Sequence, residues 1–218
     1  MADRAGLTGI LLAGGASTRF GSPKALARLD RRTLAEIAWE TLGDACDERL
    51  AVGKRADCLE LPFEVVDDRT DVRAPLAGVV AGLWAASHDV CVVLPVDCPR
   101  VTADALRALA AACAGADAAV PDRTRPLPGA YARTALPVLE RRLATGALAL
   151  RDALTELDVR EVALDPALLV NVNTPAELEA LQRPATGSSP CGATTRSRSA
   201  PVPTSETSTS SSRSTNST

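Results

Sequence analysis

The sequence predicts a three-layer α/β protein of the Rossmann-like type, in which a mostly parallel sheet is covered by helices on both faces. Short, continuously apolar segments alternate along the chain with longer segments whose apolar residues recur at helical spacing, which is typical of strand–helix–strand units. Aromatic residues make up only 2% of the chain although 46% of it is apolar, so Ala, Leu and Val must fill the core. Aliphatic strands packed against Ala- and Leu-rich helices satisfy that composition.

The expected strands are short apolar runs, as buried parallel strands are. The clearest is Val-Cys-Val-Val-Leu at 90–94, which Pro95 ends. The first, at 8–12, runs directly into two glycines and so leads into a loop. Further strands are expected at 50–52, 63–66, 118–120, 129–131 and 159–164.

The expected helices carry start and stop signals. Thr102 is the predicted N-cap of a helix to about Cys113, with Gly115 just beyond it. Pro lies at the first helical position of 75–86, and a capping box with Pro at the first position opens a last helix at 174–182. The remaining expected helices are 34–42, 136–143 and 148–157.

Residues 1–184 form one predicted domain, because the composition changes sharply after Pro184. More than half of residues 185–218 are Ser or Thr, and such a segment buries too little apolar surface to offset the entropy of ordering it. We therefore expect a disordered tail whose deletion changes neither the melting temperature nor the activity of the protein.

The charge and the absence of targeting signals exclude several classes of partner. The chain carries a formal net charge of −3 and has no basic stripe with interleaved aromatics, so it is not expected to bind nucleic acid. It shows no signal peptide and no apolar stretch of about 18 residues, so no membrane is expected and a cytoplasmic location follows. The six cysteines form no CxxC pair, and the first five lie in or beside apolar segments, so they are interpreted as reduced, buried thiols rather than disulfides or metal ligands.

The loop after the first expected strand carries the strongest chemical signal, and it reads LAGGASTRFGSPK over residues 12–24. Gly14 and Gly15 allow the backbone to approach a ligand closely, and successive N–H groups there form an anion nest. Arg19 and Lys24 add two cations suited to a triphosphate. The spacing matches neither a Walker A loop nor GxGxxG. The alternative is a flexible glycine turn with solvated cations.

Asp97 follows the clearest strand, within Pro-Val-Asp-Cys-Pro at 95–99. Ligands of open α/β sheets bind at the carboxyl ends of the strands, so this carboxylate is placed to hold Mg²⁺ against phosphate oxygens. The alternative is a capping or turn aspartate.

Asn171 and Asn173 precede the last helix and share one face of an extended segment. Together with the positive helix N-terminus, they suit a polar, anionic acceptor. A turn with a capping box is the alternative, although it leaves both asparagines unexplained.

The order of these motifs resembles that of the molybdenum cofactor guanylyltransferases, the MobA-like nucleotidyltransferases. The resemblance covers about residues 7–182, and the glycine-rich loop alone marks only the wider group of sugar-nucleotide-type nucleotidyltransferases. The most specific element is Asn-Val-Asn-Thr-Pro at 171–175. The matching segments are LAGG…K at 12–24, Asp68-Arg69, PLAG at 75–78, VLPVDCP at 93–99, RPLPGAY at 125–131 and NVNTP.

The resemblance implies transfer of GMP from GTP to the phosphate of molybdopterin, with release of pyrophosphate and with Mg²⁺ as cofactor. It implies that Leu12, Ala13 and Gly14 contact the nucleotide, that Lys24 grips its phosphates and that Asp68 helps to hold the nucleoside. Molybdenum-insertion proteins or apo-molybdoenzymes are further partners that this activity would suit.

The resemblance further implies that Asp97 binds nucleotide and Mg²⁺, while Asn171 and Asn173 face the pterin. Lys24 and Arg19 would stabilise charge in the transition state. Some members place an Asn after the second strand, where this chain has Gly53, so guanine selectivity is open.

Two other readings remain open at this point. One keeps the fold and changes the substrates, to CTP with molybdopterin or to a sugar or polyol phosphate acceptor. The other is a non-catalytic protein that carries nucleotide or molybdopterin. The lone histidine, His88, is expected to be a surface residue rather than a base.

Overall fold

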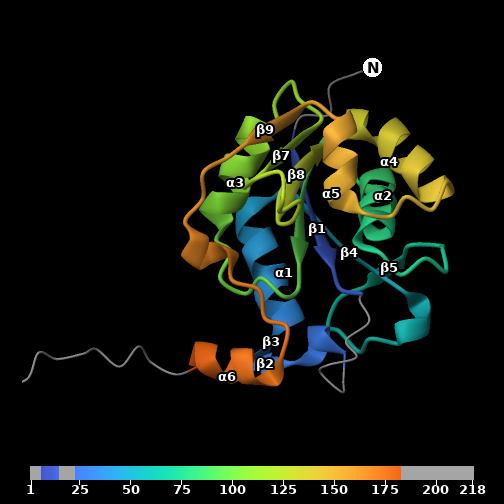
Figure 1. The fold of residues 1–218 in the computed structure, drawn as a ribbon. Coiled ribbons are helices and arrows are strands. Elements are labelled where there is room, and N and C mark those ends of the chain that lie inside the picture. Colours follow the sequence, from blue (N-terminus) through green and yellow to red (C-terminus); the bar gives the residue numbers. More distant parts are fainter. Residues whose placement is uncertain (1–5, 15–22, 183–218) are drawn as a thin grey trace, which may run out of the picture. The chain divides into compact units, whose positions relative to one another are not determined.

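A seven-stranded sheet lies at the centre of the computed structural model, which describes residues 6–14 and 23–182 (Figure 1). The strand order is β5–β4–β1–β6–β8–β7–β9, and among the described strands of this sheet β8 alone runs antiparallel to its neighbours. The strands are β1 (Leu7–Leu12), β4 (Glu48–Gly53), β5 (Val65–Asp67), β6 (Val90–Pro95), β7 (Ala118–Val120), β8 (Gly129–Ala132) and β9 (Val159–Glu161). A separate hairpin pairs β2 (Arg28–Leu29) with β3 (Arg32–Thr33).

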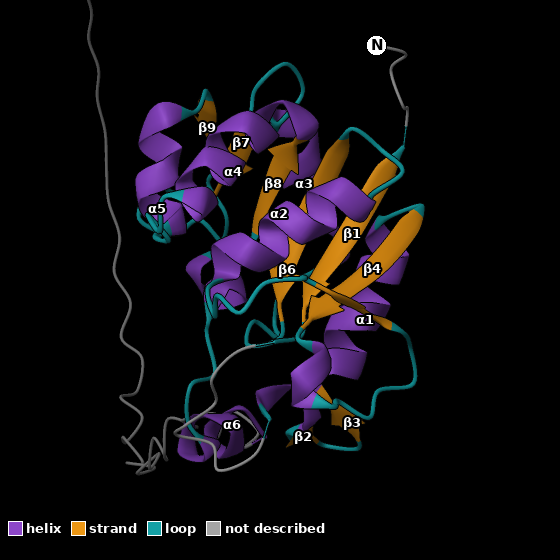
Figure 2. Cartoon of the chain, turned by 90° about the vertical axis from the view of Figure 1, so that its right-hand side faces the viewer, coloured by secondary structure: helices purple, strands orange, loops and turns teal. Residues whose placement is uncertain are grey.

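Helices cover both faces of the sheet (Figure 2). One face packs against α1 (Leu34–Ala45) and α3 (Ala103–Ala112). The other packs against α2 (Pro75–Ala85), α4 (Leu136–Ala144) and α5 (Leu150–Ala153). The last helix, α6 (Pro175–Gln182), lies beside β2. Single turns of 3-10 helix are η1 (Lys24–Leu26), η2 (Arg55–Asp57), η3 (Arg133–Ala135), η4 (Leu154–Glu156) and η5 (Pro166–Leu169).

The side chains of β1 show how the sheet divides the core in two. Leu11 is wholly buried in the cluster formed with α1 and α3, whereas Ile10 and Leu12 belong to the cluster formed with α2 and α4. Successive strand residues point to opposite faces, so a strand covered on both sides must be apolar at every position. This requirement explains why the buried parallel strands appear in the sequence as uninterrupted apolar runs.

The predicted fold class is confirmed, and every expected strand and helix is present. The capping boxes and N-caps explain the helix starts: Thr102 Oγ1 accepts from the N–H of Ala105 at 3.3 Å, and Thr174 Oγ1 accepts from the N–H of Glu177 at 3.2 Å. The expected helix at 148–157 is divided into α5 and η4, and the strands at 63–66 and 159–164 are shorter than expected. The β2–β3 hairpin was not predicted, because two-residue strands carry no periodicity.

Gly82 of α2 is required by the close packing of this helix on β1. A Cβ atom at Gly82 would lie 2.7 Å from Cδ1 and Cγ2 of Ile10, a wholly buried side chain. Gly82→Ala is therefore expected to lower the free energy of unfolding by about 1–3 kcal/mol in urea denaturation, even though Ala is the better helix former.

Gly43→Ala in α1 is the matched control for this prediction. A Cβ atom at Gly43 would meet Nη1 of Arg49 at 2.6 Å, and the end of a flexible side chain moves aside easily. We expect this variant to be at least as stable as the wild type. A Gly82→Ala protein of wild-type stability would show that the contact with Ile10 is not tight.

Candidate active site

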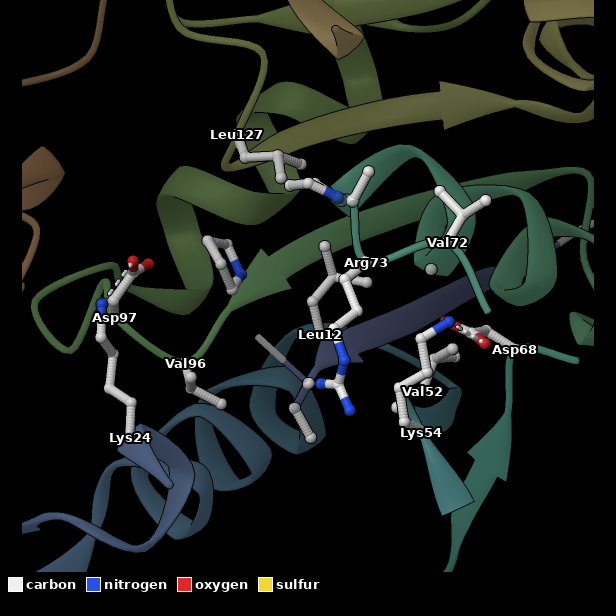
Figure 3. A pocket seen from close by; sticks show the side chains of 17 residues that line it. Leu12, Lys24, Val52, Lys54, Asp68, Val72, Arg73, Val96, Asp97 and Leu127 are labelled. Carbon is white, nitrogen blue, oxygen red and sulfur yellow. Dashed lines mark hydrogen bonds and ion pairs between the residues drawn. The ribbon is translucent and has the colours of Figure 1, made fainter. Parts of the chain in front are cut away.

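A cavity of about 290 Å³ lies at the carboxyl ends of β1, β4 and β6 (Figure 3). These strands are parallel, so their ends meet at one edge of the sheet, where open α/β sheets bind ligands. The lining combines an apolar part with charged side chains. Its apolar side chains include Leu12, Val52, Val72, Val96 and Leu127, and its charged ones are Lys24, Lys54, Asp68, Arg73 and Asp97.

Two glycines bring the ends of β1 and β4 close together at the base of the cavity. A Cβ atom on Gly14 would lie 3.3 Å from Cα of Gly53, and one on Gly53 would lie 3.1 Å from Cγ1 of Val65. A side chain at position 53 therefore requires Val65 to shift. The polar side chain after β4 is supplied instead by the next residue, Lys54, which lines the cavity.

Asp97 and Lys24 form one end of the site. Asp97 lines the cavity, and its neighbours Val96 and Cys98 are buried. Lys24 Nζ lies 3.2 Å from Asp97 Oδ2. Lys24 begins η1, and this turn is anchored by Ala25, which is buried in the core.

The asparagine segment joins the same end of the site. Val172 is wholly buried and its N–H donates to the carbonyl of Asp97 at 2.8 Å, while the two flanking asparagines are exposed. Asn173 Oδ1 accepts from Lys24 Nζ at 3.2 Å, and Asn171 Oδ1 accepts from Cys98 Sγ at 3.3 Å. Asn171 also lines a second, more open cavity of about 570 Å³ with Arg125 and Leu169. The two asparagines thus lie next to Asp97 without lining the first cavity.

Asp68 lies at the opposite end of the first cavity, in a pair that the sequence did not predict. Its Oδ1 accepts from Lys54 Nζ at 2.7 Å, and the two side chains are only 7% and 11% exposed. Lys54 also donates to the carbonyl of Thr70. Lys54 directly follows β4 and lies two residues beyond the strand expected at 50–52, and this position at the ligand-binding edge is the signal that could have identified it.

The structure brings together Leu12, Ala13, Gly14, Lys24, Asp68 and Asp97 around one cavity. The predicted residues Gly15 and Arg19 lie outside the described residues. Within the described ranges no three His, Cys, Asp or Glu side chains gather as a metal cage.

The cysteine and histidine expectations need partial correction. Cys91, Cys98 and Cys113 are buried thiols, but Cys58 is exposed; the five cysteines within the described ranges are free, and Cys191 lies beyond them. Burial raises the pKa of Cys113 to about 11 and that of Cys91 to about 12, so neither is a ready nucleophile.

His88 is not the surface residue that the sequence suggested. Its side chain is 19% exposed, and Nδ1 lies 3.0 Å from Oγ1 of the buried Thr8. It precedes β6 and thus lies at the amino-terminal edge of the sheet, away from the cavity.

The fold and the charged cavity at the strand ends define an α/β nucleotidyltransferase-type protein, and comparison with known proteins agrees. Residues 9–162 match the MobA-like NTP transferase domain. A molybdenum cofactor guanylyltransferase of Desulfosudis oleivorans is 33% identical over 187 residues, which cover 79% of this chain and 93% of that protein. The chain belongs to the family of MobA-like NTP transferases, with molybdenum cofactor guanylyltransferases as its relatives.

Solved structures show the same fold. Molybdopterin-guanine dinucleotide biosynthesis protein A from Archaeoglobus fulgidus has a TM-score of 0.70 and 27% identity, covering 80% of this chain and 96% of that one. The 2-C-methyl-D-erythritol 4-phosphate cytidylyltransferase from Thermus thermophilus shares the fold alone, with a TM-score of 0.61 and 21% identity over 79% of this chain and 96% of that one. In the described ranges, no helix has the length and apolar character needed to cross a membrane.

Proposed function

We propose that the protein transfers GMP from GTP to the phosphate of molybdopterin and releases pyrophosphate. The observation that carries this proposal is the contact of Lys24 with both Asp97 and Asn173. These contacts join the phosphate end of the cavity, the end at Lys24 and Asp97 where the proposal places the phosphates, to the asparagine segment that the sequence analysis assigns to the acceptor. The names of the relatives supply the identity of the two substrates.

The reaction requires positioning and charge stabilisation rather than a protein nucleophile. The acceptor phosphate attacks the α-phosphorus of GTP in line, and pyrophosphate leaves. Lys24 holds the phosphates, Arg19 adds a second cation, and N–H groups of the glycine-rich loop beyond Ala13 supply the anion nest, because the N–H of Ala13 itself donates to the carbonyl of Val52 at 2.9 Å. Leu12 and Asp68 would contact the nucleoside.

The described residues fit a single Mg²⁺ at Asp97. Magnesium usually binds proteins through one or two carboxylates together with substrate phosphates, and Asp97 offers one carboxylate that already faces the cation of Lys24 at 3.2 Å. When bound, Mg²⁺ would neutralise charge on the phosphate oxygens.

Pyrophosphate release measured with GTP, CTP and ATP, each with and without molybdopterin, tests the proposal. We expect release with GTP only when molybdopterin is present. Preferred turnover of CTP would identify a cytidylyltransferase. Nucleotide binding without turnover would favour a carrier protein.

Asn171→Ala is expected to raise the KM for molybdopterin, or to lower kcat, by about 5- to 100-fold, with little change in GTP affinity. Removing the amide leaves its partner on the acceptor buried and unpaired, which costs on the order of 1–3 kcal/mol. GTP affinity should change little, because Asn171 contacts Cys98 rather than Lys24. Asn173→Ala is the informative comparison, because its contact with Lys24 should also affect GTP. Melting curves must accompany both variants, since Asn173 adjoins the cap of α6. Loss of GTP binding in Asn171→Ala with normal pterin binding would place the acceptor elsewhere.

A further inference from the structure

Two ion pairs join the walls of the cavity away from Asp97. One wall is the segment after β4, and the other is the segment after β5. The inner pair is Lys54–Asp68, which is almost completely buried. The outer pair is Arg73–Asp57, in which Arg73 Nη2 donates to Asp57 Oδ1 at 2.8 Å. The Arg73 side chain is 47% exposed and that of Asp57 is 17% exposed, so the outer pair lies near the mouth of the cavity.

Arg73 of the outer pair lines the cavity between its two charged ends. Figure 3 places Lys24 and Asp97 at one end of the cavity and Lys54 and Asp68 at the other, with Arg73 between them, nearer the second group. If the phosphates occupy the first end, the flat base lies on the apolar lining beside Arg73. Asp57 closes this region from the side of β1, since a Cβ on Gly14 would lie 3.8 Å from Asp57 Oδ2.

The three cations of the described cavity lining differ in what they offer a base. Lys24 is at the phosphate end, and Lys54 is engaged by Asp68 and by the carbonyl of Thr70. Arg73 carries a planar guanidinium with five N–H donors, and its contact with Asp57 uses one terminal nitrogen. Guanine presents two adjacent acceptors, O6 and N7, that match this fork, whereas adenine replaces O6 by an amino donor and cytosine lacks the pair.

We infer that Arg73 selects guanine by donating to O6 and N7, and that Asp57 positions its guanidinium. This inference rests on the proposed function and names the residue that sets its base preference. It also explains how a chain with Gly53 after β4 discriminates between bases.

Calorimetric titration with Mg²⁺ and four nucleotides tests the inference: GTP, ATP, ITP and 7-deaza-GTP, in which a C–H replaces N7. The wild type is expected to bind ITP nearly as well as GTP, because ITP keeps both acceptors. It should bind 7-deaza-GTP about 5- to 10-fold more weakly, because one hydrogen bond is lost. Arg73→Ala should bind GTP on the order of 10- to 100-fold more weakly and should bind GTP and 7-deaza-GTP equally.

Three further variants separate the two-donor geometry of the Arg73 guanidinium from its positive charge. Arg73→Lys keeps the charge but should lose the discrimination between GTP and 7-deaza-GTP. Asp57→Asn should lower the ratio of GTP to ATP affinity, a readout that a general loss of stability would not move. Arg55→Ala is the control, because it removes the same charge from the facing wall, on the segment that carries Asp57, through a side chain that is 88% exposed; its base preference should equal that of the wild type.

Failure of this inference is distinguishable from failure of the proposed function. An Arg73→Ala protein that keeps the wild-type preference for GTP over ATP contradicts the role of Arg73 and leaves GMP transfer untouched. Arg73-dependent guanine selection without transfer to molybdopterin contradicts the proposed function alone. A wild type that binds CTP in preference to GTP overturns both.

Discussion

Asp97→Asn is expected to reduce turnover by about 100-fold or more while leaving the melting temperature near that of the wild type. The substitution keeps the shape of the side chain but removes the charge that faces Lys24 at 3.2 Å. In the proposed mechanism this carboxylate anchors Mg²⁺ beside the phosphates, so its loss would leave the charge that develops on the α-phosphoryl group without that stabilisation. Loss of a major electrostatic stabiliser has an effect of this size. Initial rates measured over a range of Mg²⁺ concentrations provide the test.

Asp104→Asn serves as the control for this variant. Asp104 lies in the first turn of α3 and its side chain is 93% exposed, so the same charge is removed without touching the cavity. Its rate should equal that of the wild type. Near-normal, Mg²⁺-dependent turnover in Asp97→Asn would contradict the assignment of Asp97.

Lys24→Ala is expected to weaken GTP binding and to slow transfer, by on the order of 100-fold in kcat/KM. Lys24 contacts both Asp97 and Asn173, so its removal separates the phosphate end of the site from the acceptor segment as well as removing a cation. Lys24→Arg should restore only part of the activity, because a guanidinium differs from an ammonium in shape and hydration.

Nucleotide titration measures the loss of GTP affinity in Lys24→Ala, and steady-state kinetics measures the loss of transfer rate. Arg31→Ala is a suitable control, since Arg31 is an exposed cation on the turn between β2 and β3. Unchanged affinity and rate in Lys24→Ala would show that this lysine does not hold the triphosphate.

The central strands β1 and β6 were predictable because both faces of each are covered and their residues form runs of buried apolar side chains, whereas β4 and β9 include exposed charged residues. The antiparallel direction of β8 was not predictable, because its pairing with β6 and β7 depends on contacts between distant segments. The capping box Thr33–Glu36 at the start of α1 has a sequence signal of its own, Thr-x-x-Glu.

The lining of the cavity was predictable where motifs follow strands, as for Lys24 and Asp97, which both line it. Arg73 and Asp57 could not be recognised, because each is a single charged residue in an irregular segment and only the fold pairs them. The same limit applies to Asn173. Its spacing from Asn171 indicates a shared face, but its contact with Lys24 joins segments that are far apart in the chain.

The most direct test of the central claim follows the phosphorus atoms of GTP labelled with 32P at either the α- or the γ-phosphate. With molybdopterin, Mg²⁺ and wild-type protein, the α-label is expected in the pterin product and the γ-label in pyrophosphate, while Asp97→Asn transfers neither. Transfer of the γ-label to the pterin, or release of labelled inorganic phosphate without a labelled pterin product, would contradict the account.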